Sequence, residues 1–202
     1  MKKYILTIDQ GTTSTRAILF DHKANTIGIY QMEFTQICPK SGYVEHNADE
    51  IYQTVLECIK NVIINASIEP EEIDSIAITN QRETTVAFGF DGHPLANAIC
   101  WQSRQSQKIC DDLIARGYED MIYQKTGLHI NPYFSASKIR YLIDNNQNIK
   151  DLYDAGKALF GTMDTYILYR LTNGASFKTD ATNASRTMLY NIHTLSYDDE
   201  LL

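Results

Sequence analysis

Short runs of apolar residues, separated by polar segments, predict most of the strands. The runs over residues 4–8 and 17–20 suit two strands, and the polar segment between them suits a hairpin loop. Residues 24–30 alternate with a period of two, and residues 73–79 read as a buried strand that ends abruptly in polar residues. The pattern predicts strands over residues 4–8, 17–20, 24–30, 73–79, 86–90 and 158–160.

Apolar positions at helical spacing predict the helices. Asn47 is a plausible N-cap, because Asp49 and Glu50 follow it and load the first turn with negative charge. The pattern predicts helices over residues 47–66, 103–115, 119–125, 135–144 and 162–170, and polar loops over residues 36–47 and 144–150. Strands followed by a helix and further strands indicate an α/β domain built around a mixed sheet.

Composition and charge narrow the class of protein. The chain has 202 residues, of which 44% are apolar and 21% charged, so it suits one large globular domain or two small ones. Its net charge of −7 argues against nucleic acid or an anionic membrane surface as a partner, although a small anionic substrate is still compatible with it. No apolar run approaches the roughly 18–20 residues that span a membrane.

Cysteine usage and the N-terminus predict a cytoplasmic location. Four cysteines occur without a C-x-x-C pair, and Cys58 and Cys110 fall on the apolar faces of predicted helices. Buried free thiols suit a reducing cytosol. The first apolar run is too short for a signal peptide.

The predicted hairpin loop carries the clearest candidate chemistry. Backbone N–H groups and hydroxyls can meet phosphate oxygens, Arg16 adds charge-assisted donors, and Asp9 can hold a divalent cation. Gly11 can adopt unusual backbone angles. A polar turn with an acid at its entrance is the competing interpretation, and neither a P-loop nor a Rossmann glycine motif occurs in the chain. The hydroxyl-bearing residues of the loop are Thr12, Thr13, Ser14 and Thr15.

A second group of polar and aromatic residues suits a small polyol. Arg82 and Glu83 follow an apolar strand, where open α/β sheets place ligand contacts, and together they suit a vicinal diol. A solvated ion pair is the alternative. Trp101 is either a core anchor or the apolar wall of a pocket, and Tyr133 either binds a ligand or packs against the next helix. The polar run 182–187 indicates only a turn with side-chain hydrogen bonds to the backbone.

Several segments together are more specific than any single residue. They are residues 9–16, 42–46, 78–85, 101–102, 131–135, 161–165 and 182–188. In this combination they resemble the N-terminal part of the FGGY carbohydrate kinases, over essentially all 202 residues. The segment Asn80-Gln81-Arg82-Glu83-Thr84 resembles the members that phosphorylate glycerol.

The resemblance implies a fold, a reaction and a set of site residues. The fold would be a ribonuclease-H-like (actin-like ATPase) domain with a mixed sheet flanked by helices, the first of two domains around a cleft. The reaction would be transfer of the ATP γ-phosphoryl group to glycerol, giving glycerol 3-phosphate and ADP, with Mg²⁺ present. Thr12, Thr13, Ser14 and Arg16 would contact phosphate, and Asp9 would serve Mg²⁺. Arg82, Glu83 and Tyr133 would bind the glycerol hydroxyls, and Trp101 would lie against its carbons.

The length of the chain qualifies this expectation. Members of the family are more than twice as long, so residues 1–202 would form only the N-terminal domain of a cytoplasmic enzyme. The resemblance implies that the full-length enzyme is a homo-oligomer. The catalytic base would lie beyond Leu202. The alternatives are a truncated, non-catalytic binding module and a kinase of another sugar in the same family. Tyr43 and Tyr141 stand where the family commonly has tryptophan.

Overall fold

The computed structural model describes residues 3–202, which form two compact units. The first unit contains the described part of Met1–Gln36 together with Asn47–Gln81. The second contains Ile37–His46 and Arg82–Leu202. The chain therefore passes between the units three times. Residues 37–46 belong to the second unit, residues 47–81 return to the first, and all later residues belong to the second.

A four-stranded mixed sheet forms the first unit, with the strand order β3-β2-β1-β5. The strands β1, β2 and β3 are antiparallel neighbours, whereas β5 pairs with β1 in parallel. This arrangement confirms the predicted mixed sheet. The strands are β1 (Tyr4–Gln10), β2 (Ser14–Asp21), β3 (Thr26–Glu33) and β5 (Ile73–Asn80).

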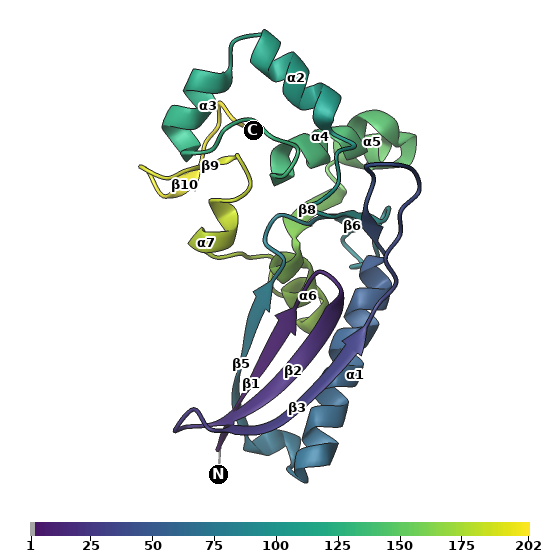
Figure 1. Ribbon diagram of the computed structural model, residues 1–202, viewed down its shortest axis with the longest axis vertical. Helices are drawn as coiled ribbons and strands as arrows, with labels where there is room; N and C mark the ends of the chain where they lie inside the picture. Colours follow the sequence, from purple (N-terminus) through teal and green to yellow (C-terminus); the bar gives the residue numbers. More distant parts are fainter. Residues whose placement is uncertain (1–2) are drawn as a thin grey trace. The chain divides into compact units, whose positions relative to one another are not determined.

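Helix α1 (Ala48–Ala66) packs along this sheet and closes the core of the first unit (Figure 1). Its apolar stripe meets alternate residues of β1 and β2, because strand side chains point to opposite faces at successive positions. The Asn47 side chain accepts a hydrogen bond from the Glu50 backbone N–H at 3.1 Å, which confirms the predicted N-cap. The buried residues of this core are Leu6, Ala17, Leu19, Cys58 and Val62.

The predicted strand over residues 73–79 is confirmed as β5, but the prediction that it is buried is wrong. Strand β5 lies at the edge of the sheet, and most of its residues are exposed, with Ile76 52% accessible. Helix α1 packs over β2 and β3 rather than over β5. A continuous apolar run therefore predicts a strand correctly here but does not predict what covers it.

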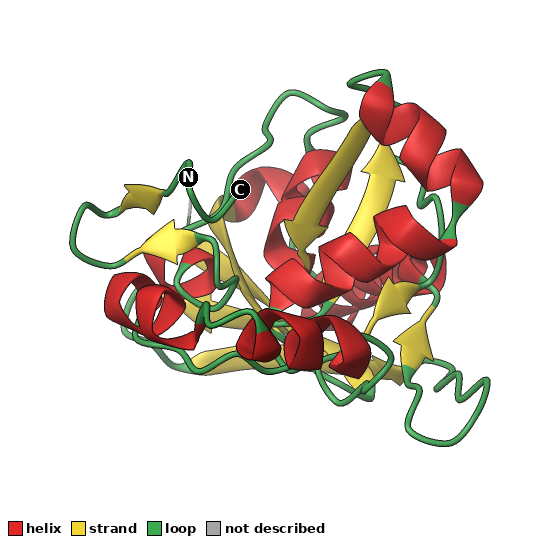
Figure 2. Ribbon diagram, turned by 90° about the horizontal axis from the view of Figure 1, so that it is seen from above, coloured by secondary structure: helices red, strands yellow, loops and turns green. Residues whose placement is uncertain are grey.

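The second unit contains an antiparallel sheet of strand order β4-β7-β6-β8, and helices α4, α5 and α6 contact its strands β6 and β8 (all helices are red in Figure 2). Helices α4 and α5 supply part of its core, in which Ala87 and Ile99 of the sheet meet Leu142, Ile143 and Ile149. The strands are β4 (Glu45–His46), β6 (Thr85–Gly89), β7 (Ala98–Ile99), β8 (Ala158–Thr162), β9 (Tyr190–Asn191) and β10 (Ser196–Tyr197). The helices are α2 (Gln107–Ala115), α3 (Glu119–Thr126), α4 (Ser135–Asn145), α5 (Gln147–Asp154), α6 (Met163–Leu171) and α7 (Ala181–Ala184).

One helix starts later than predicted, and one helix was not predicted. Helix α2 begins at Gln107 rather than at residue 103. Helix α5 occupies much of the stretch predicted to be a loop over residues 144–150. The Asn146 side chain caps α5 by accepting from the Ile149 N–H at 3.2 Å, and Ile149 is fully buried. A single buried isoleucine is a weak periodic signal, which explains why the pattern did not reveal this helix.

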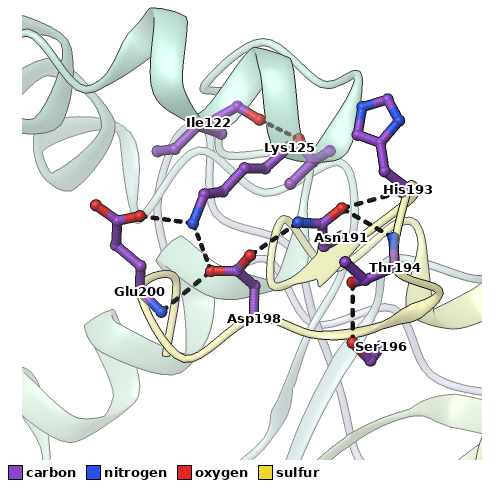
Figure 3. Close-up of polar contacts among 9 residues, drawn as sticks. Ile122, Lys125, Asn191, His193, Thr194, Ser196, Asp198 and Glu200 are labelled. Atoms are coloured by element: carbon purple, nitrogen blue, oxygen red, sulfur yellow. Dashed lines mark hydrogen bonds and ion pairs between the residues drawn. The ribbon is translucent and has the colours of Figure 1, made fainter.

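A polar network attaches the hairpin of β9 and β10 to helix α3 (Figure 3). The Lys125 ammonium donates to Asp198 at 2.7 Å and to Glu200 at 2.6 Å, and Asn191 Nδ2 donates to Asp198 at 2.9 Å. The hydrogen bond from Lys125 is the main cause that holds the pKa of Asp198 below its usual value. The network joins segments that are far apart in the sequence, since Lys125 and Asp198 are separated by 73 residues.

The structure describes the state of the cysteines and the length and polarity of the helices. All four cysteines are free thiols, and Cys58 and Cys110 are buried as predicted. Burial raises the pKa of both thiols, which keeps them protonated and unreactive. Within residues 3–202 every helix is either too short or too polar to cross a bilayer.

Candidate functional site

The first candidate site belongs to the first unit and is the hairpin between β1 and β2. Asp9 lies opposite Arg16 in the strand register, and the turn itself is shorter than predicted, because only residues 11–13 lie outside the two strands. The Gly11 N–H donates to the Ser14 carbonyl at 2.9 Å and closes this turn. Most of the predicted loop residues therefore lie on strands, which makes their positions more rigid than a loop would.

Gly11 is required by space rather than by an unusual backbone angle. It is absent from the residues with positive φ, in contrast to the predicted role. A Cβ atom at this position would lie 3.2 Å from the Ser14 carbonyl oxygen, so a side chain would push the turn open.

The side chains of the hairpin divide into structural and exposed groups. Thr15 contributes its hydroxyl to the core, where it lies 2.7 Å from the Thr54 hydroxyl, and so it is withdrawn from any ligand. Arg16 Nε donates to Gln31 at 3.0 Å, and Arg16 Nη1 lies 3.5 Å from the Asp9 carboxylate. The guanidinium is 40% exposed and keeps further donors for an anion. Thr13 is exposed at the tip.

Asp9 suits a magnesium ion that is held mainly by substrate phosphates and water. Its carboxylate is 40% exposed. Residues 3–202 contain no cluster of three acidic, cysteine or histidine side chains that could enclose a metal by itself. Mg²⁺ is commonly bound through one or two carboxylates with several waters and phosphate oxygens, so a single aspartate fits this ion.

The second candidate site belongs to the second unit and surrounds Glu83, which lies in a turn shortly before β6. Its carboxylate is buried, and its Oε1 accepts from Arg186 Nε at 2.7 Å. Arg82 is exposed and has no ion-pair partner within the described residues. The predicted alternative of a solvated Arg82–Glu83 pair is therefore wrong: Glu83 points inward to a distant arginine, and Arg82 keeps all its donors available.

Aromatic rings lie next to the ion pair of Glu83 and Arg186. The Trp101 and Tyr133 rings meet edge to face, with 5.4 Å between their centroids. Arg186 links them to Glu83, because its guanidinium lies 6.0 Å from the centre of the Tyr133 ring and 5.0 Å from that of Phe134. Glu83, Trp101 and Tyr133 thus lie in one cluster.

The turn that carries Tyr133 is specified locally. The Tyr133 N–H donates to the Asn131 side chain at 2.9 Å, and the Phe134 N–H donates to the Asn131 carbonyl at 3.2 Å. Pro132 occupies the second position of this turn, where its restricted φ is favourable. The backbone N–H of Trp101 donates to the Thr84 hydroxyl at 3.2 Å, which connects the tryptophan to the residue after Glu83.

Sequence reasoning missed two cations of this cluster, Arg186 and Lys138. Arg186 lies in the polar run that predicted only a turn, and its partner Glu83 is 103 residues away. Lys138 is fully buried on α4, and its ammonium donates to the carbonyls of Glu83, Tyr133 and Phe134. Burial lowers the pKa of Lys138 to about 7. A lysine one turn before Leu142, on the buried stripe of α4, was the available signal.

The second candidate site offers the kinds of groups that a small hydroxylated molecule would need. Glu83 Oε2 has no partner within the described residues, so it can accept from a hydroxyl while Oε1 remains bound to Arg186. Arg82 offers donors, and the Trp101–Tyr133 pair offers an apolar surface for carbon atoms.

Comparison with known proteins identifies the family. Residues 4–202 match the N-terminal domain of the FGGY family of carbohydrate kinases. The crystal structure of Plasmodium falciparum glycerol kinase with ADP matches 98% of this chain and 40% of that chain, with a TM-score of 0.90 and 36% identity. Gluconate kinase from Lactobacillus acidophilus matches 100% of this chain and 39% of that chain, with a TM-score of 0.88 and 28% identity. The fold is thus that of the actin-like ATPases, and the chain belongs to the FGGY carbohydrate kinases.

Curated relatives agree with this assignment. The chain is 50% identical over 203 residues to the glycerol kinase of Geobacillus kaustophilus and 53% identical over 202 residues to that of Enterococcus casseliflavus. Both matches cover 100% of this chain but only 41% and 40% of the relatives. The chain therefore spans about two fifths of the length of the curated relatives it matches.

Proposed function

We propose that this chain supplies the glycerol-binding and phosphate-binding parts of an ATP-dependent glycerol kinase. The reaction transfers the γ-phosphoryl group of ATP to a terminal hydroxyl of glycerol and yields sn-glycerol 3-phosphate and ADP. The relatives that support this substrate are named glycerol kinases and are 50% and 53% identical to the chain. The single structural observation that carries the proposal is the buried Glu83 carboxylate, with one oxygen bound and one open beside an aromatic pair.

The residues around Glu83 have distinct roles in acceptor binding. The open oxygen of Glu83 accepts from one glycerol hydroxyl, and Arg82 and Tyr133 contact the other hydroxyls. Trp101 packs against the carbon backbone. Glycerol has three hydroxyls on three carbons, so directional polar contacts, rather than apolar area, must select it.

The hairpin residues hold the phosphates. Thr12, Thr13, Ser14 and Arg16 donate to phosphate oxygens, and Asp9 holds the Mg²⁺ that accompanies ATP. When bound, the ion neutralises charge on the phosphate oxygens. Because phosphoryl transfer depends on positioning and charge stabilisation, donors on two paired strands are suited to it. Thr15 has no role in this proposal, since its hydroxyl is bonded within the core.

Turnover requires residues beyond the 202 described by this sequence. Nothing among the site residues is placed to act as the general base, since Glu83 is bound to Arg186 and serves the substrate. The chain covers only about 40% of its relatives. We therefore expect the isolated 202 residues to show no measurable turnover. We place the whole protein in the cytoplasm, where ATP is available and the four free thiols remain reduced.

The test is ATP-dependent phosphorylation of glycerol by the whole polypeptide that carries this chain. Arg82→Ala should reduce kcat/KM for glycerol by about 10- to 100-fold, because it removes a charged donor from a substrate hydroxyl. Arg116→Ala is the matched control, since it removes an exposed arginine that bonds only to Tyr118 within the described residues. Equal activity of the two variants would refute the assignment of Arg82.

One observation favours a second candidate, a kinase of another sugar. The gluconate kinase of Lactobacillus acidophilus matches the whole chain with a TM-score of 0.88, so the fold alone does not select glycerol. Acceptor competition separates the two functions. A sugar or sugar acid that suppresses glycerol phosphorylation and is itself phosphorylated faster would support the second candidate.

A further inference from the structure

Lys138 is a buried cation at the start of helix α4. It has no exposed surface, and the helix places it three residues after Ser135, the first helical residue. Lysine is rarely buried without a specific partner, because an ammonium loses its hydration there. Its presence on the buried stripe of α4, four residues before Leu142, therefore requires an explanation beyond packing.

The Lys138 ammonium donates to three backbone carbonyls. Its Nζ donates to the Glu83 carbonyl at 3.1 Å, to the Phe134 carbonyl at 3.1 Å and to the Tyr133 carbonyl. In its protonated form the Lys138 side chain can donate three hydrogen bonds and accept none, so this set of acceptors uses its full capacity. Above its pKa of about 7 the neutral amine keeps two donors for the same carbonyls. The Tyr133 and Phe134 carbonyls lie just before α4, whereas the Glu83 carbonyl comes from a turn 55 residues earlier in the chain.

The two turns joined by this ammonium carry side chains that we assign to glycerol binding. One presents the Glu83 carboxylate and is followed by Thr84, which bonds to the Trp101 N–H. The other presents the Tyr133 ring, which contacts Trp101. Hydrogen bonds to carbonyls restrain the backbone from which these side chains project. A displacement of either turn would change the distance between the carboxylate and the tyrosine.

We propose that Lys138 is a positioning residue for the acceptor site, which joins the turn of Glu83 to the turn of Tyr133 and so sets their spacing. This inference rests on the proposed function, because the acceptor site is assigned there. Lys138 does not touch the substrate in this account. It acts through the backbone of two residues that do, and it is separate from Arg186, which binds the Glu83 carboxylate itself.

The test compares two buried positions on the same helix of the whole polypeptide. Lys138→Met keeps a long apolar stem and removes all three donors. Leu142→Ala, one turn further along α4, opens the apolar cluster that Leu142 forms with Ala87 and Ile149, in which neither Glu83 nor Tyr133 takes part. Both variants should lose thermal stability. Only Lys138→Met should raise the KM for glycerol, by about tenfold or more, with the KM for ATP within about twofold of wild type.

A binding measurement without turnover supplies an independent readout. Glycerol should raise the melting temperature of the wild type and of Leu142→Ala, because it binds only the folded state, and should have little effect on Lys138→Met. If Lys138→Met does not fold, Lys138→Gln, which retains two donors, replaces it in both assays. The expected result for that variant is a smaller rise in the KM for glycerol.

The outcomes separate this inference from the proposed function. A wild type that phosphorylates glycerol, with a KM for glycerol that rises no more in the Lys138 variant than in Leu142→Ala, would overturn the role of Lys138 alone. A parallel rise in the KM for ATP would do the same, since it would indicate general loss of structure. A wild type that phosphorylates neither glycerol nor any sugar would overturn the proposed function, and this inference with it.

Discussion

Replacement of Arg186 by alanine should affect both the stability of the protein and its use of glycerol. Arg186 Nε donates to the Glu83 carboxylate at 2.7 Å, and the Glu83 side chain is only 5% exposed. The variant leaves a buried carboxylate without its charged partner. It also removes the guanidinium from the face of the Phe134 ring, 5.0 Å away.

The magnitude follows from the burial of the two partners. Loss of one partner from a fully buried pair costs about 3–5 kcal/mol. Arg186 is 27% exposed, so water can partly replace it, and we expect a loss of about 2–3 kcal/mol in the free energy of unfolding. If Glu83 turns to meet that water, the same free energy is lost from acceptor binding. At about 1.36 kcal/mol for each factor of ten, kcat/KM for glycerol falls by about 30- to 160-fold.

The assay combines denaturant unfolding with steady-state kinetics on the whole polypeptide. Arg140→Ala is the control, because Arg140 forms an exposed ion pair with Asp144 on one turn of α4 and should change stability by less than about 0.5 kcal/mol. In a Glu83→Gln background the Arg186→Ala replacement should cost at least about 1 kcal/mol less, since no buried charge remains. Equal unfolding free energies and equal glycerol kinetics for Arg186→Ala and Arg140→Ala would refute the reasoning.

Three further predictions concern single positions. Gly11→Ala should lower the free energy of unfolding by about 1 kcal/mol, because its Cβ would lie 3.2 Å from the Ser14 carbonyl oxygen. It should also raise the KM for ATP more than the KM for glycerol, as kinetics with each substrate varied in turn would show. Asn47→Ala should cost about 1 kcal/mol through loss of the α1 cap, with both KM values unchanged, as measured by denaturation and kinetics. The pKa of Lys138 is lowered by burial from 10.5 to about 7, so between these values the unfolded chain binds the extra proton and stability rises with pH. Unfolding at several pH values should show this rise in wild type and its loss in Lys138→Met, and parallel curves would contradict it.

Local patterns predicted most of the longer elements, although not helix α5, and they did not predict which elements pack together. The hairpin of β1 and β2, the Asn47 cap and helix α4 follow from residues that are close in sequence. Strand β5 was predicted as a strand, but its exposure depends on where α1 packs, which no local pattern records. The division of the sheets between two units depends likewise on contacts between distant segments.

The candidate site shows the same limit more sharply. Glu83 and Tyr133 could be selected from their residue types and neighbours, yet the cations that hold them come from α4 and from a turn 103 residues beyond Glu83. Tyr43 and Tyr141 are a further example, because they lie 98 residues apart in the sequence and yet pack edge to face with 6.4 Å between their ring centres. No local pattern predicts this contact.

The choice of acceptor tests the central claim most directly. The measurement is kcat/KM for ATP-dependent phosphorylation of glycerol, gluconate and xylulose by the whole polypeptide, at equal enzyme concentration. The account predicts that glycerol exceeds both sugars by at least about 100-fold, because a site built from Glu83, Arg82 and the Trp101–Tyr133 pair matches a three-carbon polyol. A kcat/KM for gluconate or xylulose that equals or exceeds that for glycerol would contradict it.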